Sequence, residues 1–132
     1  MGYLIIQRLP PFKPMEGNLA PNNKLESAKH IGIGRLKGPE MIAFAANGAM
    51  LASLMTGEVV KVYSDGRIER LVRIGDEKNE TLCDDFEPFQ QAHESCGRPL
   101  GLRLRGDWLY LADAFNGLLK VNIITGELIS RY

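Results

Sequence analysis

The sequence of 132 residues holds sixteen basic and sixteen acidic side chains and has no formal net charge at pH 7. A nucleic-acid partner is therefore not expected, because binding to a phosphate backbone depends on a surplus of lysine and arginine. No apolar run approaches the roughly 20 residues that a membrane-spanning helix requires, and the apolar cluster at residues 3–6 is too short for the core of a signal peptide. The composition predicts one soluble globular unit.

Residues 1–30 are expected to form an extended lead-in to the folded part of the chain. Four of the seven prolines fall here, at positions 10, 11, 14 and 21. Proline fixes φ and removes a backbone hydrogen-bond donor, which disfavours regular structure. The pair Asn22-Asn23 adds a turn signal near the end of the segment. We therefore expect the first sheet to begin after residue 30.

The folded part contains an internal repeat, because the pattern of residues 38–62 returns at residues 97–121. Each copy opens with a glycine and a proline, and Lys61-Val62 of the first copy corresponds to Lys120-Val121 of the second. Each copy predicts four short apolar strands joined by tight turns that contain glycine. Strands are expected at residues 41–45, 59–63 and 68–74 in the first copy, and at residues 118–123 and 127–132 in the second.

This repeat predicts an all-β fold, a β-propeller in which each copy forms one blade. Sheet repeats of roughly 40 to 50 residues are typical of propeller blades, and a charged segment without strand alternation at residues 75–95 accounts for the longer spacing here. We predict blade 1 at residues 31–82, a loop at residues 83–96 and blade 2 at residues 97–132. A closed propeller needs about four to eight blades. The remaining blades are therefore the first partners expected. The inner face of blade 1 and the far side of blade 2, where those blades would pack, are expected to be open.

Cys83 and Cys96 are the only cysteines, and they bracket the loop between the two predicted blades. They are either two free thiols or a disulfide; zinc is not expected, because no second close pair of cysteines or histidines completes a tetrahedral site. We favour the disulfide, since closing a loop of this size stabilises a fold by about 3 kcal/mol in the chain-entropy model. A disulfide indicates an oxidising compartment, the lumen of the secretory pathway or the cell surface. Asn79, which begins the triplet Asn-Glu-Thr, is then a candidate glycosylation site.

Glu40 is the candidate metal ligand. The innermost strand of a propeller blade starts near the central channel, and Glu40 directly precedes the strand predicted at residues 41–45. A carboxylate at this mouth suits a hard cation such as calcium when other oxygen donors join it; the alternative is that Glu40 only caps a turn. Asp113 and Asn116 lie in a loop that opens on the same face as Glu40. They either line the mouth or form an Asx turn that leads into the next strand.

Four motifs together resemble the strictosidine synthase-like family, in its animal branch. They are GPE at residues 38–40, DGRI at residues 65–68, CGRPLG at residues 96–101 and ADAFNGLLKV at residues 112–121, and the likeness covers about residues 19–132. The resemblance implies a six-bladed propeller, of which this chain supplies about the first two blades, with Cys83 and Cys96 paired. Related propellers, including paraoxonases and gluconolactonase-like hydrolases, place a calcium-binding glutamate where this sequence has Glu40. Their other calcium ligands come from later blades, and Leu100 stands about where paraoxonases carry a histidine.

The function that the resemblance implies is calcium-dependent hydrolysis of a small ester or lactone, of the arylesterase or lactonase kind. Glu40 would supply one ligand to a metal that polarises the ester carbonyl. No catalytic residue is identified, and the chain alone is not expected to be active. The alternative is a non-catalytic propeller at the cell surface or in the lumen that binds a partner, because a fold does not determine a function. A membrane anchor is expected in the full-length family member but not in this chain.

Overall fold

The computed structural model describes residues 12–75, 80–84 and 94–131. The chain divides by its contacts into two units, Met1–His30 and Ile31–Tyr132. In the first unit the described residues form one turn of 3-10 helix, η1 (Gly17–Leu19), within otherwise irregular backbone. No side chain among residues 12–30 is buried. The core of the protein therefore lies in the second unit.

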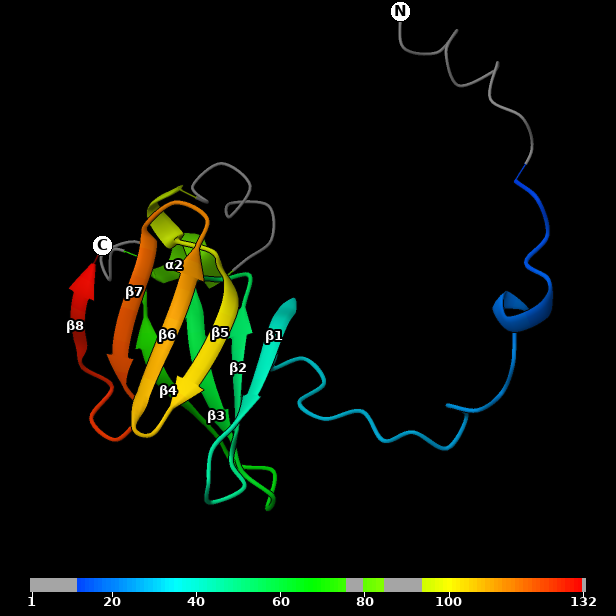
Figure 1. Cartoon of the computed structure of the whole chain (residues 1–132), viewed down its shortest axis with the longest axis horizontal. Helices are drawn as coiled ribbons and strands as arrows, with labels where there is room; N and C mark the ends of the chain where they lie inside the picture. Colours follow the sequence, from blue (N-terminus) through cyan, green and yellow to red (C-terminus); the bar gives the residue numbers. More distant parts are fainter. Residues whose placement is uncertain (1–11, 76–79, 85–93, 132) are drawn as a thin grey trace, which may run out of the picture. The chain divides into compact units, whose positions relative to one another are not determined.

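The second unit consists of two four-stranded antiparallel sheets, and in each the strand order follows the chain (Figure 1). The first sheet, blade 1, contains β1 (Pro39–Phe44), β2 (Met50–Leu54), β3 (Glu58–Val62) and β4 (Ile68–Arg73). The second sheet, blade 2, contains β5 (Pro99–Arg105), β6 (Trp108–Asp113), β7 (Gly117–Asn122) and β8 (Leu128–Arg131). The predicted all-β fold, with one four-stranded sheet for each copy of the repeat, is confirmed.

A shared apolar core lies between the two sheets. Both blades contribute residues that are fully buried to one cluster: Leu51, Val59, Leu109, Leu111, Leu119 and Val121. Along β6 the buried Leu109 and Leu111 alternate with more exposed residues, as expected of a strand with one face on a core. Burial of each such side chain contributes about 1.5–3 kcal/mol. Each blade thus depends on the other for the burial of the face that the two blades share.

The outer face of blade 2 carries aromatic and basic side chains. Nζ of Lys120 stands 4.3 Å from the ring centroid of Trp108 and 5.8 Å from that of Tyr110, within the range of cation–π attraction. Arg103 and Arg105 are exposed and pair across the sheet with Tyr110 and Trp108 respectively. The two aromatic rings are partly buried on this face.

The two copies of the repeat differ at one pair of positions on their first strands. Ala43 and Ala45 of blade 1 correspond to Arg103 and Arg105 of blade 2, because β1 pairs with β2 as β5 pairs with β6. The two alanines pack against the shared core. Small side chains allow blade 2 to approach blade 1 closely, whereas two arginines keep the same place on blade 2 polar.

The opposite face of blade 1 is covered by the segment that leads into β1. Four residues there are almost inaccessible to solvent: Ala52, Leu54, Val60 and Val62. Leu36, in the segment that directly precedes β1, packs against them, together with Ile68 of β4. The expectation that this face is open is therefore wrong over these four residues, because Leu36 folds back onto the sheet that follows it. Ile42 and Phe44 of β1 remain exposed.

The chain passes from blade 1 to blade 2 through a tight crossing at Cys96. Cys83 and Cys96 form the predicted disulfide, with their Cα atoms 5.5 Å apart, and both are fully buried. The backbone of residues 95 and 96 lies directly against Gly57 and Gly75, so that a Cβ at either glycine would overlap a carbonyl oxygen. Backbone thus packs on backbone at this point, and only glycine permits it.

The segment between the blades contains a short helix. α2 (Glu80–Asp84) carries Cys83 to the disulfide, where the sequence predicted irregular structure without strand alternation. Most of the predicted loop, residues 85–93, lies outside the described residues. The candidate glycosylation site Asn79 also lies outside them, and its modification stays a prediction.

Gly57→Ala is expected to destabilise the fold far more than Gly48→Ala. Both glycines have a φ of +82°, so both variants share the strain of a left-handed residue, about 1–2 kcal/mol. At Gly48 no atom lies within 4 Å of the added Cβ, whereas at Gly57 it would overlap the Cys96 carbonyl oxygen. In urea unfolding we expect Gly57→Ala to cost at least about 3 kcal/mol. Equal costs for the two variants would contradict the tight crossing.

Removing the disulfide is expected to lower the free energy of unfolding by about 3 kcal/mol, because the unfolded chain regains the entropy of an open loop. The measurement compares the wild-type chain with the double variant Cys83→Ala, Cys96→Ala in urea without reductant. Wild-type chain unfolded in the presence of reductant should lose a similar amount of stability, which serves as the control. A wild-type unfolding curve that does not respond to reductant would contradict the pairing.

Candidate functional site

Glu40 and Arg98 meet where the first strands of the two blades begin. Glu40 is the second residue of β1, Arg98 directly precedes β5, and these two strands are neighbours. Nη2 of Arg98 donates to Oε1 of Glu40 at 2.7 Å, and Nε donates to the same oxygen at 3.3 Å. The side chain of Glu40 is 28% exposed and that of Arg98 is 43% exposed. Each blade supplies one member of an ion pair that solvent can reach.

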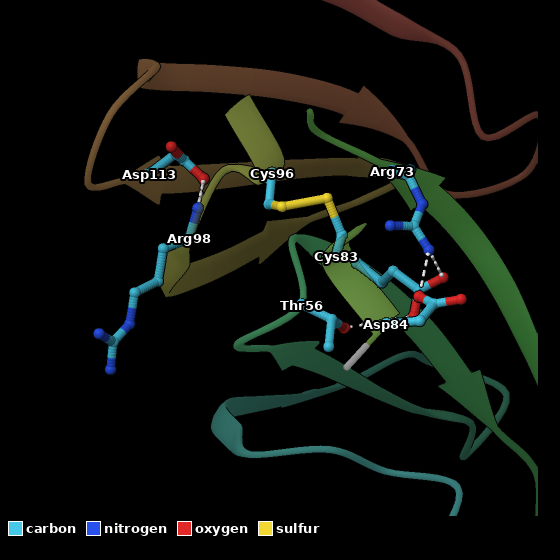
Figure 2. Close-up of a disulfide and its surroundings, with 8 residues drawn as sticks. Thr56, Arg73, Cys83, Asp84, Cys96, Arg98 and Asp113 are labelled. Atoms are coloured by element: carbon cyan, nitrogen blue, oxygen red, sulfur yellow. Dashed lines mark hydrogen bonds and ion pairs between the residues drawn. A yellow bond between two sulfur atoms is a disulfide. The ribbon is translucent and has the colours of Figure 1, made fainter. Parts of the chain in front are cut away.

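Arg98 is held in place by hydrogen bonds of its backbone. Its N–H donates to Oδ2 of Asp113 at 2.7 Å (Figure 2), and its carbonyl oxygen accepts the N–H of Ala114 at 3.0 Å. The residue before it, Gly97, has a φ of +75° and follows the disulfide-bonded Cys96. The side chain of Arg98 therefore starts from a fixed point beside the disulfide and extends away from it, as Figure 2 shows.

Asp113 and Asn116, the other predicted site residues, lie near Arg98 but are occupied by local hydrogen bonds. Oδ1 of Asp113 accepts the backbone N–H groups of Phe115 at 3.0 Å and Asn116 at 2.9 Å, and the Asn116 side-chain amide at 2.9 Å. Asp113 is only 6% exposed. These are the contacts of an Asx turn, the structural alternative that the sequence left open. A role for either residue in lining a ligand site stays a prediction.

A calcium site is not assembled by the residues that the structure describes. No group of three or more histidine, cysteine, aspartate or glutamate side chains lies together among them. Calcium takes 6–8 oxygen ligands, whereas Oε1 of Glu40 already accepts two bonds from Arg98 and both oxygens of Asp113 accept N–H groups. Leu100, which stands about where paraoxonases carry a histidine, is 44% exposed, and its side chain has no atom that can bind a metal. Glu40 as a calcium ligand therefore stays a prediction that this chain alone does not support.

A second polar cluster lies beside α2, formed by Glu58, Arg73 and Asp84. Nη2 of Arg73 is 2.9 Å from Oε1 of Glu58 and 2.9 Å from Oδ1 of Asp84 (Figure 2), and the Arg73 side chain is only 4% exposed. A pocket of about 170 Å³ next to this cluster is lined by Arg35, Lys37, Leu54, Thr56, Glu58 and Asp84. The cluster ties α2 to the ends of β3 and β4, and thereby fixes the helix that carries Cys83.

Sequence reasoning missed Arg98 and Arg73. Arg98 lies in the CGRPLG motif directly before β5. The repeat aligns Glu40 with Pro99 and not with Arg98, so comparison of the two copies does not reveal the pair. Arg73 pairs with Glu58 across β3 and β4, and opposite charges on adjacent strands are a recognisable signal once the register is known. The register was not known from the sequence, because a bulge interrupts the pairing between Val59 and Val60.

Comparison with known proteins indicates the same family as the sequence motifs do. A family model described as "Strictosidine synthase-like, N-terminal" matches residues 17–62. Adipocyte plasma membrane-associated protein of Gallus gallus is 37% identical over 119 residues, which cover 89% of this chain and 26% of that protein. The Homo sapiens protein of the same name is 39% identical over 107 residues, covering 80% of this chain and 23% of that protein. Protein STRICTOSIDINE SYNTHASE-LIKE 3 of Arabidopsis thaliana is 29% identical over 119 residues, covering 86% of this chain and 30% of that protein.

The chain belongs to the strictosidine synthase-like family. Its two sheets are therefore the first blades of a strictosidine synthase-like propeller. The chain spans about a quarter of the length of the adipocyte plasma membrane-associated proteins that it matches. Those relatives are named as membrane-associated, and the disulfide is compatible with the secretory pathway or the cell surface. Within the described residues, no helix is both long and apolar enough to cross a membrane.

Asp113→Ala is expected to destabilise this strictosidine synthase-like chain by about 3 kcal/mol, because three partly buried backbone N–H groups, those of Arg98, Phe115 and Asn116, lose their acceptor. Asp65→Ala is the matched control: Oδ1 of Asp65 accepts the Arg67 N–H at 2.9 Å in an exposed turn, and water can replace it at a cost of about 1 kcal/mol. Urea unfolding of both variants measures the difference. Equal losses would show that Asp113 is not a structural residue.

Proposed function

We propose that the mouth formed by Glu40 and Arg98 binds a small ester or lactone, and that the complete strictosidine synthase-like propeller hydrolyses it. The observation that carries this proposal is the convergence of a partly exposed carboxylate and a partly exposed guanidinium at the first strands of neighbouring blades. Such a pair offers an acceptor and several donors to one bound molecule. Ligand sites of this kind are concave and contain a few convergent polar groups.

The side chains of this pair suit the chemistry of ester hydrolysis. A guanidinium carries five N–H donors, and only Nε and Nη2 of Arg98 contact Glu40. The remaining donors can stabilise the negative charge that develops on a carbonyl oxygen during attack. Glu40 can accept a hydrogen bond from the attacking water through its carboxylate. Later blades are expected to supply the residues that complete the centre.

Calcium is the cofactor that the family resemblance implies, with Glu40 as one of its ligands. The described residues of this chain do not suit that ion, since Oε1 of Glu40 already accepts two bonds from Arg98 and both oxygens of Asp113 accept N–H groups. Hydrolysis as proposed here therefore uses only side chains of the protein. Calcium held chiefly by other blades stays a separate proposal.

The second candidate function is a non-catalytic propeller that binds a partner. The pairing of Glu40 with Arg98 favours it, because Oε1 of Glu40 already accepts two hydrogen bonds and is less available to a metal or a substrate. The location proposed for either function is the secretory lumen or the cell surface, as the disulfide suggests. A membrane anchor outside this chain and a glycan on Asn79 belong to the same proposal.

The test is ester hydrolysis by a closed propeller in which residues 19–132 of this chain replace the matching segment of the Gallus gallus relative. Phenyl acetate and a small aliphatic lactone serve as substrates. We expect kcat/KM to fall about 100-fold in Arg98→Gln, since removing one donor to a developing oxyanion costs this much or more. Glu40→Gln should also lose activity, and Glu127→Gln, on an exposed side chain of blade 2, should not.

The same assay separates the two candidate functions. A folded propeller that hydrolyses neither substrate above the buffer rate would favour the non-catalytic function. Hydrolysis that is unchanged in both Glu40→Gln and Arg98→Gln would remove this mouth from the reaction. A calcium chelator, added to the wild-type propeller, reports separately whether activity depends on calcium.

A further inference from the structure

A cation already lies at the carboxylate where the family resemblance places calcium. The guanidinium of Arg98 approaches Oε1 of Glu40 with two of its nitrogens, at 2.7 Å and 3.3 Å. A divalent ion bound to the same carboxylate would stand within a few ångströms of this positive charge. Repulsion at that distance is substantial in a partly desolvated site.

The backbone of Arg98 cannot move away to make room. Its N–H and carbonyl groups are bonded to Asp113 and Ala114, and the disulfide-bonded Cys96 lies two residues before it. A metal can therefore bind both carboxylate oxygens of Glu40 only if the Arg98 side chain rotates into solvent and breaks the ion pair. The free energy of that pair is lost in the exchange, which lowers the affinity of Glu40 for any cation.

The charge balance at Glu40 depends on the side chain of Arg98. Asp113 accepts the backbone N–H of Arg98, a bond that any non-proline residue at this position keeps. Replacing Arg98 by a neutral residue would therefore leave the Glu40 carboxylate without its cation. Carboxylate oxygens are the ligands that hard divalent cations prefer.

We propose that Arg98 is the resident counter-ion of Glu40 and excludes divalent cations from it. Arg98 is then the residue that determines whether the mouth of this propeller carries a metal at blade 1. The exclusion operates in the chain whether or not the complete propeller is an enzyme, so its test does not depend on ester hydrolysis.

The experiment uses the 132-residue chain with Mn²⁺ as the probe. A bound Mn²⁺ broadens the NMR signals of nearby backbone amides, and it does so even when binding is weak. In the wild-type chain we expect the amides of Glu40 and Met41 to broaden no more than that of Glu127, whose side chain is an exposed carboxylate. In Arg98→Gln we expect broadening at Glu40 and Met41 to rise several-fold above that at Glu127.

Two further variants keep the result interpretable. Arg98→Lys retains the positive charge and should exclude Mn²⁺ as the wild type does. The double variant Arg98→Gln, Glu40→Gln should lose the broadening that Arg98→Gln gains, because the acquired site needs the carboxylate. The amide spectrum of each variant without Mn²⁺ reports whether it is folded.

Selective broadening at Glu40 in the wild-type chain would overturn the proposal, because Glu40 would then bind a cation beside Arg98. Unchanged broadening in a folded Arg98→Gln variant would overturn it as well. If Arg98→Gln does not fold, Arg98→Lys decides: wild-type behaviour supports exclusion by charge, and selective broadening at Glu40 contradicts it. Inactivity of the complete propeller toward esters would contradict the proposed function and leave this exclusion intact.

Discussion

The contact on which the rest of the structure depends is the crossing of the chain at Cys96 over Gly57 and Gly75. There the backbone of one segment lies against the backbone of the turn at Gly57 and of Gly75, just after β4, with no side chain between them. The Cys83–Cys96 disulfide joins this crossing to α2, and the buried Arg73 joins α2 to β3 and β4 through Glu58 and Asp84. Blade 2 therefore starts from a point that is fixed relative to blade 1.

The position of Arg98 follows from that crossing. Arg98 comes two residues after Cys96, and its backbone is bonded to the turn that follows β6. Its side chain reaches Glu40 because β1 and β5 lie next to each other, held by the core between the two sheets. The ion pair between Glu40 and Arg98 thus depends on how the two blades are placed relative to each other.

The repeat in the sequence was sufficient to predict two four-stranded sheets, and the spacing of Cys83 and Cys96 was sufficient to favour their pairing. Glu40 was located correctly at the start of a first strand. Its partner was not predicted, because Arg98 lies far from it in the sequence and only tertiary packing brings them together. The cover that Leu36 provides for blade 1 was missed for the same reason, since a single leucine in a glycine-rich segment shows no periodicity. α2 was missed because five residues are too few for a helical pattern.

The difference between the free faces of the two blades limits how copies of this chain can stack. Two identical sheets with matching apolar faces would add to one another head to tail, and such contacts extend without end when the rotation between copies does not close a ring. Here Leu36 covers the face of β2 and β3 that points away from blade 2, while Arg103, Arg105 and Lys120 give the outer face of blade 2 a positive charge. A neighbour without acidic side chains would have to desolvate these three cations, which is costly. The divergence of a few side chains thus makes the two outward faces of this repeated fold unlike each other, so that identical copies of the chain do not match at them.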